Sequence, residues 1–234
     1  KKYTNVNVCG LHVHIGSQIV DGKPFINALK RVLEFINELK KAKVELEYLD
    51  IGGGMGIIYK DEKPQTAQDF ADAVLPYLEK TGLKIIMEPG RFIVGNAGIF
   101  VTKVLYLKDN GVKKFLIVDG GMNDLIRPDL YDAYHEIVPV KKTSAKKVKL
   151  DVVGPICESG DYFAHDRMLP LVRKGELLVI MSAGAYGYVM SSNYNVRGRS
   201  PEIIVRGDQF AITKHRETFD DLIRGESVPE FIEK

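Results

Sequence analysis

The chain has 234 residues, of which 45% are hydrophobic and 27% are charged. This composition is typical of a globular protein with a substantial core and excludes a disordered chain. A net charge of +2 gives no electrostatic reason to expect a nucleic acid as partner. No apolar run approaches the ~18 residues that a membrane-spanning helix needs. Two cysteines are too few for a disulfide framework, so we expect a cytoplasmic protein with no nucleic acid and no membrane as partner.

Short apolar runs and helical segments alternate over roughly the first 95 residues. The expected elements are strands at residues 8–15, 47–51 and 84–87 and helices at residues 24–41 and 70–78. Both helices carry apolar residues at three- and four-residue steps, which is the period of an amphipathic helix. Strands that alternate with helices predict parallel pairing and right-handed crossovers.

The pattern changes after residue 95, where strand-like runs follow one another with little helix between them. The expected strands are residues 99–107, 114–118, 147–153, 177–181 and 201–205, and a short helix is expected near residues 219–224. Turn residues such as Asp109-Asn110-Gly111 separate some of these runs. Residues 96–234 are therefore predicted to form a mostly antiparallel β domain.

The number of helix and strand pairs sets the expected fold class, which is α/β plus β. A closed (β/α)8 TIM-type barrel needs eight βα units and usually about 250 residues, whereas residues 1–95 supply three. We therefore expect residues 1–95 to be the C-terminal part of such a barrel, with its last βα units. The other units would come from a longer polypeptide or from another chain.

Three motifs stand at the ends of the three expected parallel strands, where α/β folds build their sites. They are the segments 12–17 (His-Val-His-Ile-Gly-Ser), 52–54 (Gly-Gly-Gly) and 88–91 (Glu-Pro-Gly-Arg). A triple glycine is often only a tight turn, but it also lets backbone N–H groups approach a phosphate. Arg91 would add a permanent cation and Ser17 a hydroxyl group, and the combination favours a phosphate site.

Glu88 and His14 each allow two interpretations. Glu88 follows an apolar strand, where a carboxylate needs a partner. That partner is either Arg91 or the protonated ring nitrogen of a pyridine cofactor. His14 is either a hydrogen-bonded core histidine or a side chain that lies flat against the cofactor ring.

A second group of candidate residues lies in the expected β domain. The segment 157–161 (Cys-Glu-Ser-Gly-Asp) carries a thiol and two carboxylates, and Tyr186 stands among small residues. The segment 127–131 (Arg-Pro-Asp-Leu-Tyr) adds a guanidinium and a phenol. Together these groups suit a zwitterionic substrate, with Arg127 for a carboxylate, Glu158 for an ammonium and Cys157 as a proton source.

In this order, the motifs resemble those of the fold-type III pyridoxal-phosphate (PLP) decarboxylases. The quoted segments are His-Ile-Gly-Ser, Asp-Ile-Gly-Gly-Gly, Glu-Pro-Gly-Arg, Cys-Glu-Ser-Gly-Asp and Gly-Ala-Tyr-Gly, and they lie between residues 10 and 205. The segments at 127–131 and 157–161 are similar to those of the members that act on diaminopimelate. The resemblance implies PLP as cofactor, no metal, and decarboxylation of meso-diaminopimelate to L-lysine and CO₂.

The resemblance also implies a role for each candidate residue. The cofactor phosphate would be surrounded by Ser17, Gly53, Gly54, Gly90 and Arg91. His14 would stack on the ring, and Glu88 would bind its nitrogen. The substrate would meet Arg91, Arg127, Tyr131, Glu158 and Tyr186, of which Tyr186 could also reach the phosphate, and Cys157 would donate the proton. Because Cys157 and Glu158 belong in this family to a site completed by a second subunit, a homodimer is implied.

One family motif does not occur in these residues. The Schiff-base lysine of the family lies in a Tyr-Ala-x-Lys-Ala-Asn-like segment on the first barrel strand, and no such segment is present. We therefore expect the 234 residues to be an inactive part of a longer enzyme that lacks the N-terminal barrel segment. Ornithine, arginine or carboxynorspermidine are alternative substrates, and a PLP-binding or dimerising module without catalysis is a further alternative.

Overall fold

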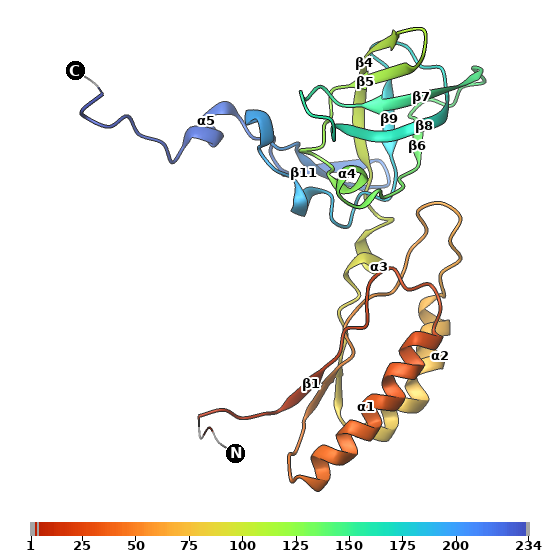
Figure 1. Cartoon of the computed structure of the whole chain (residues 1–234), viewed down its shortest axis with the longest axis vertical. Coiled ribbons are helices and arrows are strands. Elements are labelled where there is room, and N and C mark those ends of the chain that lie inside the picture. Colours follow the sequence, from red (N-terminus) through yellow and green to blue (C-terminus); the bar gives the residue numbers. More distant parts are fainter. Residues whose placement is uncertain (1–2, 4, 233–234) are drawn as a thin grey trace. The chain divides into compact units, whose positions relative to one another are not determined.

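Figure 1 shows the computed structural model of the chain, which describes residue 3 and residues 5–232. Its contacts divide it into two compact units, Lys1–Ala97 and Gly98–Lys234, here called the front unit and the back unit. The boundary expected from the sequence, after residue 95, lies two residues before this division. Within the described residues, no helix is both long enough and apolar enough to cross a lipid bilayer.

A three-stranded parallel sheet forms the centre of the front unit, with the strand order β1-β2-β3. The elements are β1 (Gly10–His12), α1 (Lys23–Lys41), β2 (Tyr48–Asp50), α2 (Ala67–Leu78), a 3-10 turn (Glu79–Thr81), β3 (Lys84–Ile86) and α3 (Gly90–Val94). The parallel pairing agrees with the prediction, and so do α1 and α2. The strands are shorter than expected, because regular pairing covers only three residues of each.

The two long helices lie side by side next to the strands (Figure 1). Their apolar faces are buried together with the central strand. The proline at the start of α1 suits its first turn, where an amide N–H would have no helical partner. Phe25 of α1 and Phe70 of α2 meet edge to face, with ring centroids 5.0 Å apart. Leu49 of β2 is fully buried beneath them. Such a side chain contributes about 1.5–3 kcal/mol through burial.

The back unit contains a six-stranded sheet in the order β6-β9-β4-β5-β7-β8. Its strands are β4 (Phe100–Asp109), β5 (Lys114–Val118), β6 (Ile137–Pro139), β7 (Lys147–Val153), β8 (Tyr162–Pro170) and β9 (Leu177–Ile180). The two outermost strands of this order, β6 and β8, also contact each other. Fully buried side chains such as Leu116, Leu178 and Phe163 form its core.

The six-stranded sheet of the back unit is mostly antiparallel, as predicted, but it has one parallel pair, and three strands of the unit were not predicted. The pair β5 and β7 is parallel, whereas its other pairs are antiparallel. Parallel pairing is possible here because a long segment that includes α4 (Arg127–Tyr131) connects the two strands. The prediction also missed β6, β8 and β11, since β6 has three residues and β8 mixes charged with apolar side chains.

The last part of the chain has little core of its own. Strands β10 (Glu202–Arg206) and β11 (Gln209–Lys214) form an antiparallel ribbon in which every residue is exposed. The short helix α5 (Phe219–Ile223) lies within the range expected from the sequence and has no buried residue. Two 3-10 turns, Tyr188–Met190 and Tyr194–Val196, precede the ribbon.

Candidate active site

The three motifs of the front unit meet at the carboxyl ends of the three parallel strands. The N–H of Gly53 donates to Nδ1 of His14 at 3.3 Å, and the N–H of Glu88 donates to the carbonyl oxygen of Gly52 at 2.9 Å. His14, the glycine turn and Glu88 therefore lie together. This convergence is what a single ligand pocket requires.

Close backbone contacts account for all three glycines, and a Cβ on Gly52 would overlap the carbonyl oxygen of Val13. A Cβ on Gly53 would overlap the carbonyl oxygen of Glu88, and one on Gly54 would overlap that of Gly16. Gly52 and Gly54 also have φ of +68° and +93°, which glycine adopts without strain. Gly90 differs, because no atom lies within 4 Å of the place of its missing Cβ. The triple glycine is therefore needed to bring the loops together, and the open space is beside Gly90.

Arg91 is held by two hydroxyl groups from other segments. Its Nη1 donates to the Tyr59 hydroxyl at 2.6 Å, and its Nη2 donates to the Ser17 Oγ at 2.9 Å. Tyr59 is buried, with 8% of its surface exposed. No local pattern pointed to Tyr59, which stands 32 residues before Arg91. These contacts fix the guanidinium beside Ser17, as a phosphate site requires.

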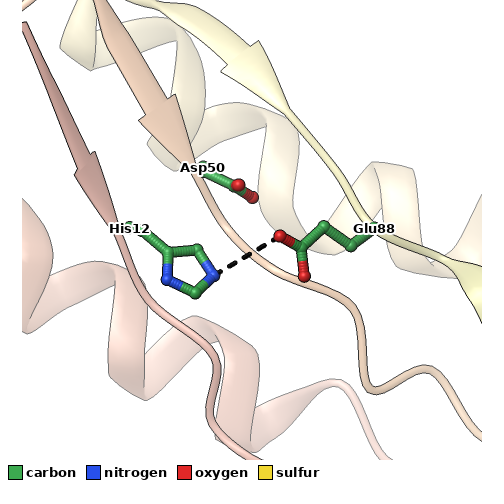
Figure 2. Close-up of side chains that lie close together, drawn as sticks. All are labelled: His12, Asp50 and Glu88. Carbon is green, nitrogen blue, oxygen red and sulfur yellow. Dashed lines mark ion pairs between the residues drawn. The ribbon is translucent and has the colours of Figure 1, made fainter.

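Glu88 faces His12 and Asp50 (Figure 2). The Nε2 of His12 lies 3.6 Å from the Oε1 of Glu88, and both side chains are about half exposed. Glu88 is thus on an open face of the sheet, and its ion-pair partner among the described residues is His12. The alternative in which Arg91 pairs with Glu88 is not what the structure shows. Sequence reasoning missed His12, although its place two residues before His14, on the same side of a strand, was a usable signal.

The residues of the front unit suit the chemistry of PLP. A guanidinium, a hydroxyl and the open space beside Gly90 fit a phosphate dianion. The exposed Glu88 carboxylate is able to accept a hydrogen bond from a protonated pyridine nitrogen. His14 lies next to the glycine turn, where its Nδ1 accepts from the N–H of Gly53.

In the back unit, Cys157 and Glu158 lie on the loop between β7 and β8, and both are exposed. Asp161 closes this loop from within: its carboxylate accepts from the N–H groups of Ile156 at 2.5 Å and Met122 at 2.7 Å. Burial raises the pKa of Asp161 above its ordinary value, and these two N–H groups only partly offset that effect. The second carboxylate of the motif therefore shapes the loop that presents Cys157 and Glu158.

Glu158 has a partner that the sequence did not suggest. The Tyr194 hydroxyl donates to Oε2 of Glu158 at 3.1 Å. This hydrogen bond raises the pKa of Tyr194, and the charge of Glu158 adds to the effect. Because 36 residues separate the two side chains, no local pattern could have paired them.

The other predicted residues of the back unit lie in different environments. Arg127 and Tyr131 share α4, but Arg127 is 6% exposed whereas Tyr131 is 60% exposed. Nη1 of Arg127 lies 3.0 Å from Nε2 of the buried His135, a residue that the sequence did not single out. Tyr186 is 40% exposed and has a φ of +58°, which is uncommon for a residue with a side chain.

A family model described as "Pyridoxal-dependent decarboxylase, C-terminal sheet domain" matches residues 17–184 of the chain. Among curated proteins, the diaminopimelate decarboxylase of Aquifex aeolicus is 49% identical over 95% of this chain and 53% of its own length. That of Archaeoglobus fulgidus is 44% identical over 99% of this chain and 57% of its own length. The chain thus spans about half the length of the curated relatives that it matches.

Solved structures give the same result. The crystal structure of the diaminopimelate decarboxylase of Helicobacter pylori complexed with L-lysine superimposes with a TM-score of 0.86 and is 40% identical. It covers 92% of this chain, and this chain covers 54% of it. At this identity the likeness extends from the fold to the sequence.

Proposed function

Because this chain belongs to the pyridoxal-dependent decarboxylase family, we propose that the whole protein removes CO₂ from meso-diaminopimelate and forms L-lysine. The observation that carries the proposal is the convergence of His14, the 52–54 turn and Glu88 at three neighbouring strand ends. The identity to diaminopimelate decarboxylases supports the choice of substrate. The L-lysine bound to the Helicobacter pylori enzyme is the product that this reaction would release.

In this proposal, bound PLP would supply the electron sink that loss of CO₂ requires. Arg91 and Ser17 would bind the phosphate in the open space beside Gly90, next to the backbone of Gly53 and Gly54. Tyr59 keeps the guanidinium in place. Glu88 holds a proton on the ring nitrogen, because a carboxylate beside that nitrogen favours its charged form. His14 fixes the plane of the ring.

The residues of the back unit would select the substrate. Diaminopimelate carries a carboxylate and an ammonium at its far end, whereas the far end of ornithine carries only an ammonium. Arg127 would bind the carboxylate, and Glu158 would bind the ammonium. Tyr131 and Tyr186 add phenol contacts, and Cys157 delivers a proton to the α-carbon.

Three parts of the proposal concern the whole protein. The front unit would be the last part of a (β/α)8 barrel, and another segment would supply the Schiff-base lysine. The loop that carries Cys157 and Glu158 would complete the site of a second subunit, which makes the enzyme a homodimer. We expect activity only from the whole protein, because the Tyr-Ala-x-Lys-Ala-Asn-like segment of the family does not occur in these residues.

Substrate comparison tests the proposal directly. The whole protein, loaded with PLP, should release CO₂ from meso-diaminopimelate and produce lysine in equal amounts. Ornithine, arginine and carboxynorspermidine should be decarboxylated far more slowly. Faster CO₂ release from any of these three would overturn the assignment of meso-diaminopimelate as the substrate. PLP binding without CO₂ release from any of the four would show that the protein is a binding module without catalysis.

A further inference from the structure

Among the described residues of the back unit, Arg127 is the one buried Lys or Arg, and its guanidinium contacts a buried histidine. His135 is fully buried, and its two ring nitrogens have different partners. Nε2 lies 3.0 Å from Nη1 of Arg127, and Nδ1 lies 2.8 Å from the carbonyl oxygen of Met181. Met181 directly follows β9, a central strand of the six-stranded sheet.

The protonation state of His135 follows from its partners. A guanidinium only donates hydrogen bonds, so Nε2 of His135 must accept from Arg127. A carbonyl oxygen only accepts, so Nδ1 must carry the proton that is donated to Met181. His135 is therefore neutral and has a single tautomer. This arrangement directs its acceptor nitrogen at Arg127.

The backbone of His135 is held as well. Nη1 of Arg167, in β8, donates to the carbonyl oxygen of His135 at 2.8 Å. The guanidinium of Arg167 also lies over the ring of Tyr134, 4.1 Å from its centroid. The segment that carries His135 is thus attached to β8 and to the end of β9. A rigid anchor of this kind keeps a long side chain in one rotamer. A side chain that is already ordered loses less conformational entropy when a ligand binds.

We propose that His135 is a positioning residue that holds the Arg127 guanidinium ready for the far carboxylate of the substrate. The inference rests on the proposed role of Arg127 and extends it to a residue that does not touch the substrate. His135 would affect only ligands that carry this carboxylate. A residue that merely supports the fold would affect all ligands alike.

Two matched variants of the whole PLP-loaded enzyme separate the nitrogens of His135. In His135→Gln the amide stands near the Nε2 position and is able to accept from Arg127. In His135→Asn the amide stands near the Nδ1 position and is able to donate to Met181 but does not reach Arg127. Calorimetry then compares the binding of lysine with that of cadaverine, which is lysine without its carboxylate.

His135→Asn should weaken lysine binding about tenfold, or about 1.4 kcal/mol, and change cadaverine binding less than about twofold. His135→Gln should keep lysine binding within about threefold of the unmodified enzyme. Equal weakening of both ligands, or no weakening of lysine in His135→Asn, would overturn the inference. If His135→Asn does not fold, a loss of the preference for lysine in His135→Gln would overturn it instead.

Arg127→Ala distinguishes this inference from the proposed function. If that variant loses the preference for lysine over cadaverine while His135→Asn keeps it, Arg127 binds the carboxylate and the inference about His135 is wrong. If Arg127→Ala keeps the preference, the assignment of Arg127 to the substrate is itself wrong.

Discussion

Strands β3 and β9 have similar sequences and opposite environments. In β3, Lys-Ile-Ile, all three residues are exposed, whereas in β9, Leu-Leu-Val-Ile, Leu178 and Ile180 are fully buried. Strand β9 lies between β4 and β6, but β3 has β2 as its one neighbour among the described strands. An apolar strand sequence thus predicts the strand, and the neighbours decide the burial. The exposed apolar residues of β3 support the proposal that further barrel strands cover this unit.

Truncation of one isoleucine in each strand should give the largest difference. Ile180→Ala should lower the free energy of unfolding of the back unit by about 2–5 kcal/mol, because it opens a cavity in a packed core. Ile86→Ala should cost the front unit less than about 1 kcal/mol, since Ile86 is 43% exposed. Urea unfolding of the 234-residue chain, followed in each unit, measures both values.

The same pair of variants tests whether β3 is covered in the whole protein. If further strands cover β3 there, the cost of Ile86→Ala should rise towards that of Ile180→Ala. An unchanged small cost in the whole protein would show that β3 stays exposed, against the proposed barrel.

Asp151 gives the back unit a buried charge for which the front unit has no described counterpart. Its side chain is 2% exposed and accepts from Lys113 Nζ at 2.6 Å, His165 Nδ1 at 3.0 Å and the N–H of Asp166 at 2.7 Å. Burial raises the pKa of Asp151, but the hydrogen bonds outweigh it, so the pKa lies below its ordinary value. The unfolded chain then binds more protons, and the stabilisation is present above about pH 4 and lost as the pH falls further.

Asp151→Asn should therefore cost about 2 kcal/mol at pH 7. The difference from the unmodified chain should shrink as the pH falls below about 4, because the unfolded chain takes up a proton there before the folded Asp151 does. Unfolding in urea at pH 7 and pH 3 measures it. Asp109→Asn is the control, since its partner Lys114 lies in a half-exposed pair that should matter less. A difference that is equal at both pH values would show that the Asp151 charge is not responsible.

Arg91 tests the polar site of the front unit. In Arg91→Lys, an ammonium replaces the planar guanidinium that donates hydrogen bonds to both Tyr59 and Ser17. The affinity of the whole protein for PLP should fall about tenfold, or about 1.4 kcal/mol. Tyr59→Phe should have a smaller effect, since Ser17 still holds the guanidinium. Titration with PLP measures both, and Arg31→Lys on the exposed face of α1 is the control. Equal affinities of Arg91→Lys and Arg31→Lys would exclude Arg91 from the phosphate site.

The sequence predicted those helices and strands whose period or limits can be recognised from their own residues. The period of α1 and the limits of β5 and β7 could be read from residues 24–41, 114–118 and 147–153. Strand β6 could not be found, because three residues carry no period. Strand β11 was also missed, because its apolar run of three residues, Phe210 to Ile212, is too short to show a period.

The candidate site, too, could be predicted from the sequence only in part. Parallel strands end at one edge of a sheet, so the meeting of His14, the 52–54 turn and Glu88 followed from the topology. Contacts between side chains from distant segments did not follow. Tyr194 reaches Glu158 only because the back unit folds its 3-10 turn near the loop between β7 and β8.

The smallest expected effect compares two capping boxes of the same chemistry. Thr66 begins α2 and exchanges hydrogen bonds with Asp69, and Thr218 begins α5 and does the same with Asp221. Helix α2 buries Phe70, Val74 and Leu78, whereas α5 buries nothing. Loss of a cap lowers the stability of a unit only if the helix unfolds together with the core. Thr66→Ala should therefore cost about 1 kcal/mol, and Thr218→Ala less than about 0.5 kcal/mol. Thermal unfolding of both variants measures this, and equal losses would show that α5 packs against a core as firmly as α2 does.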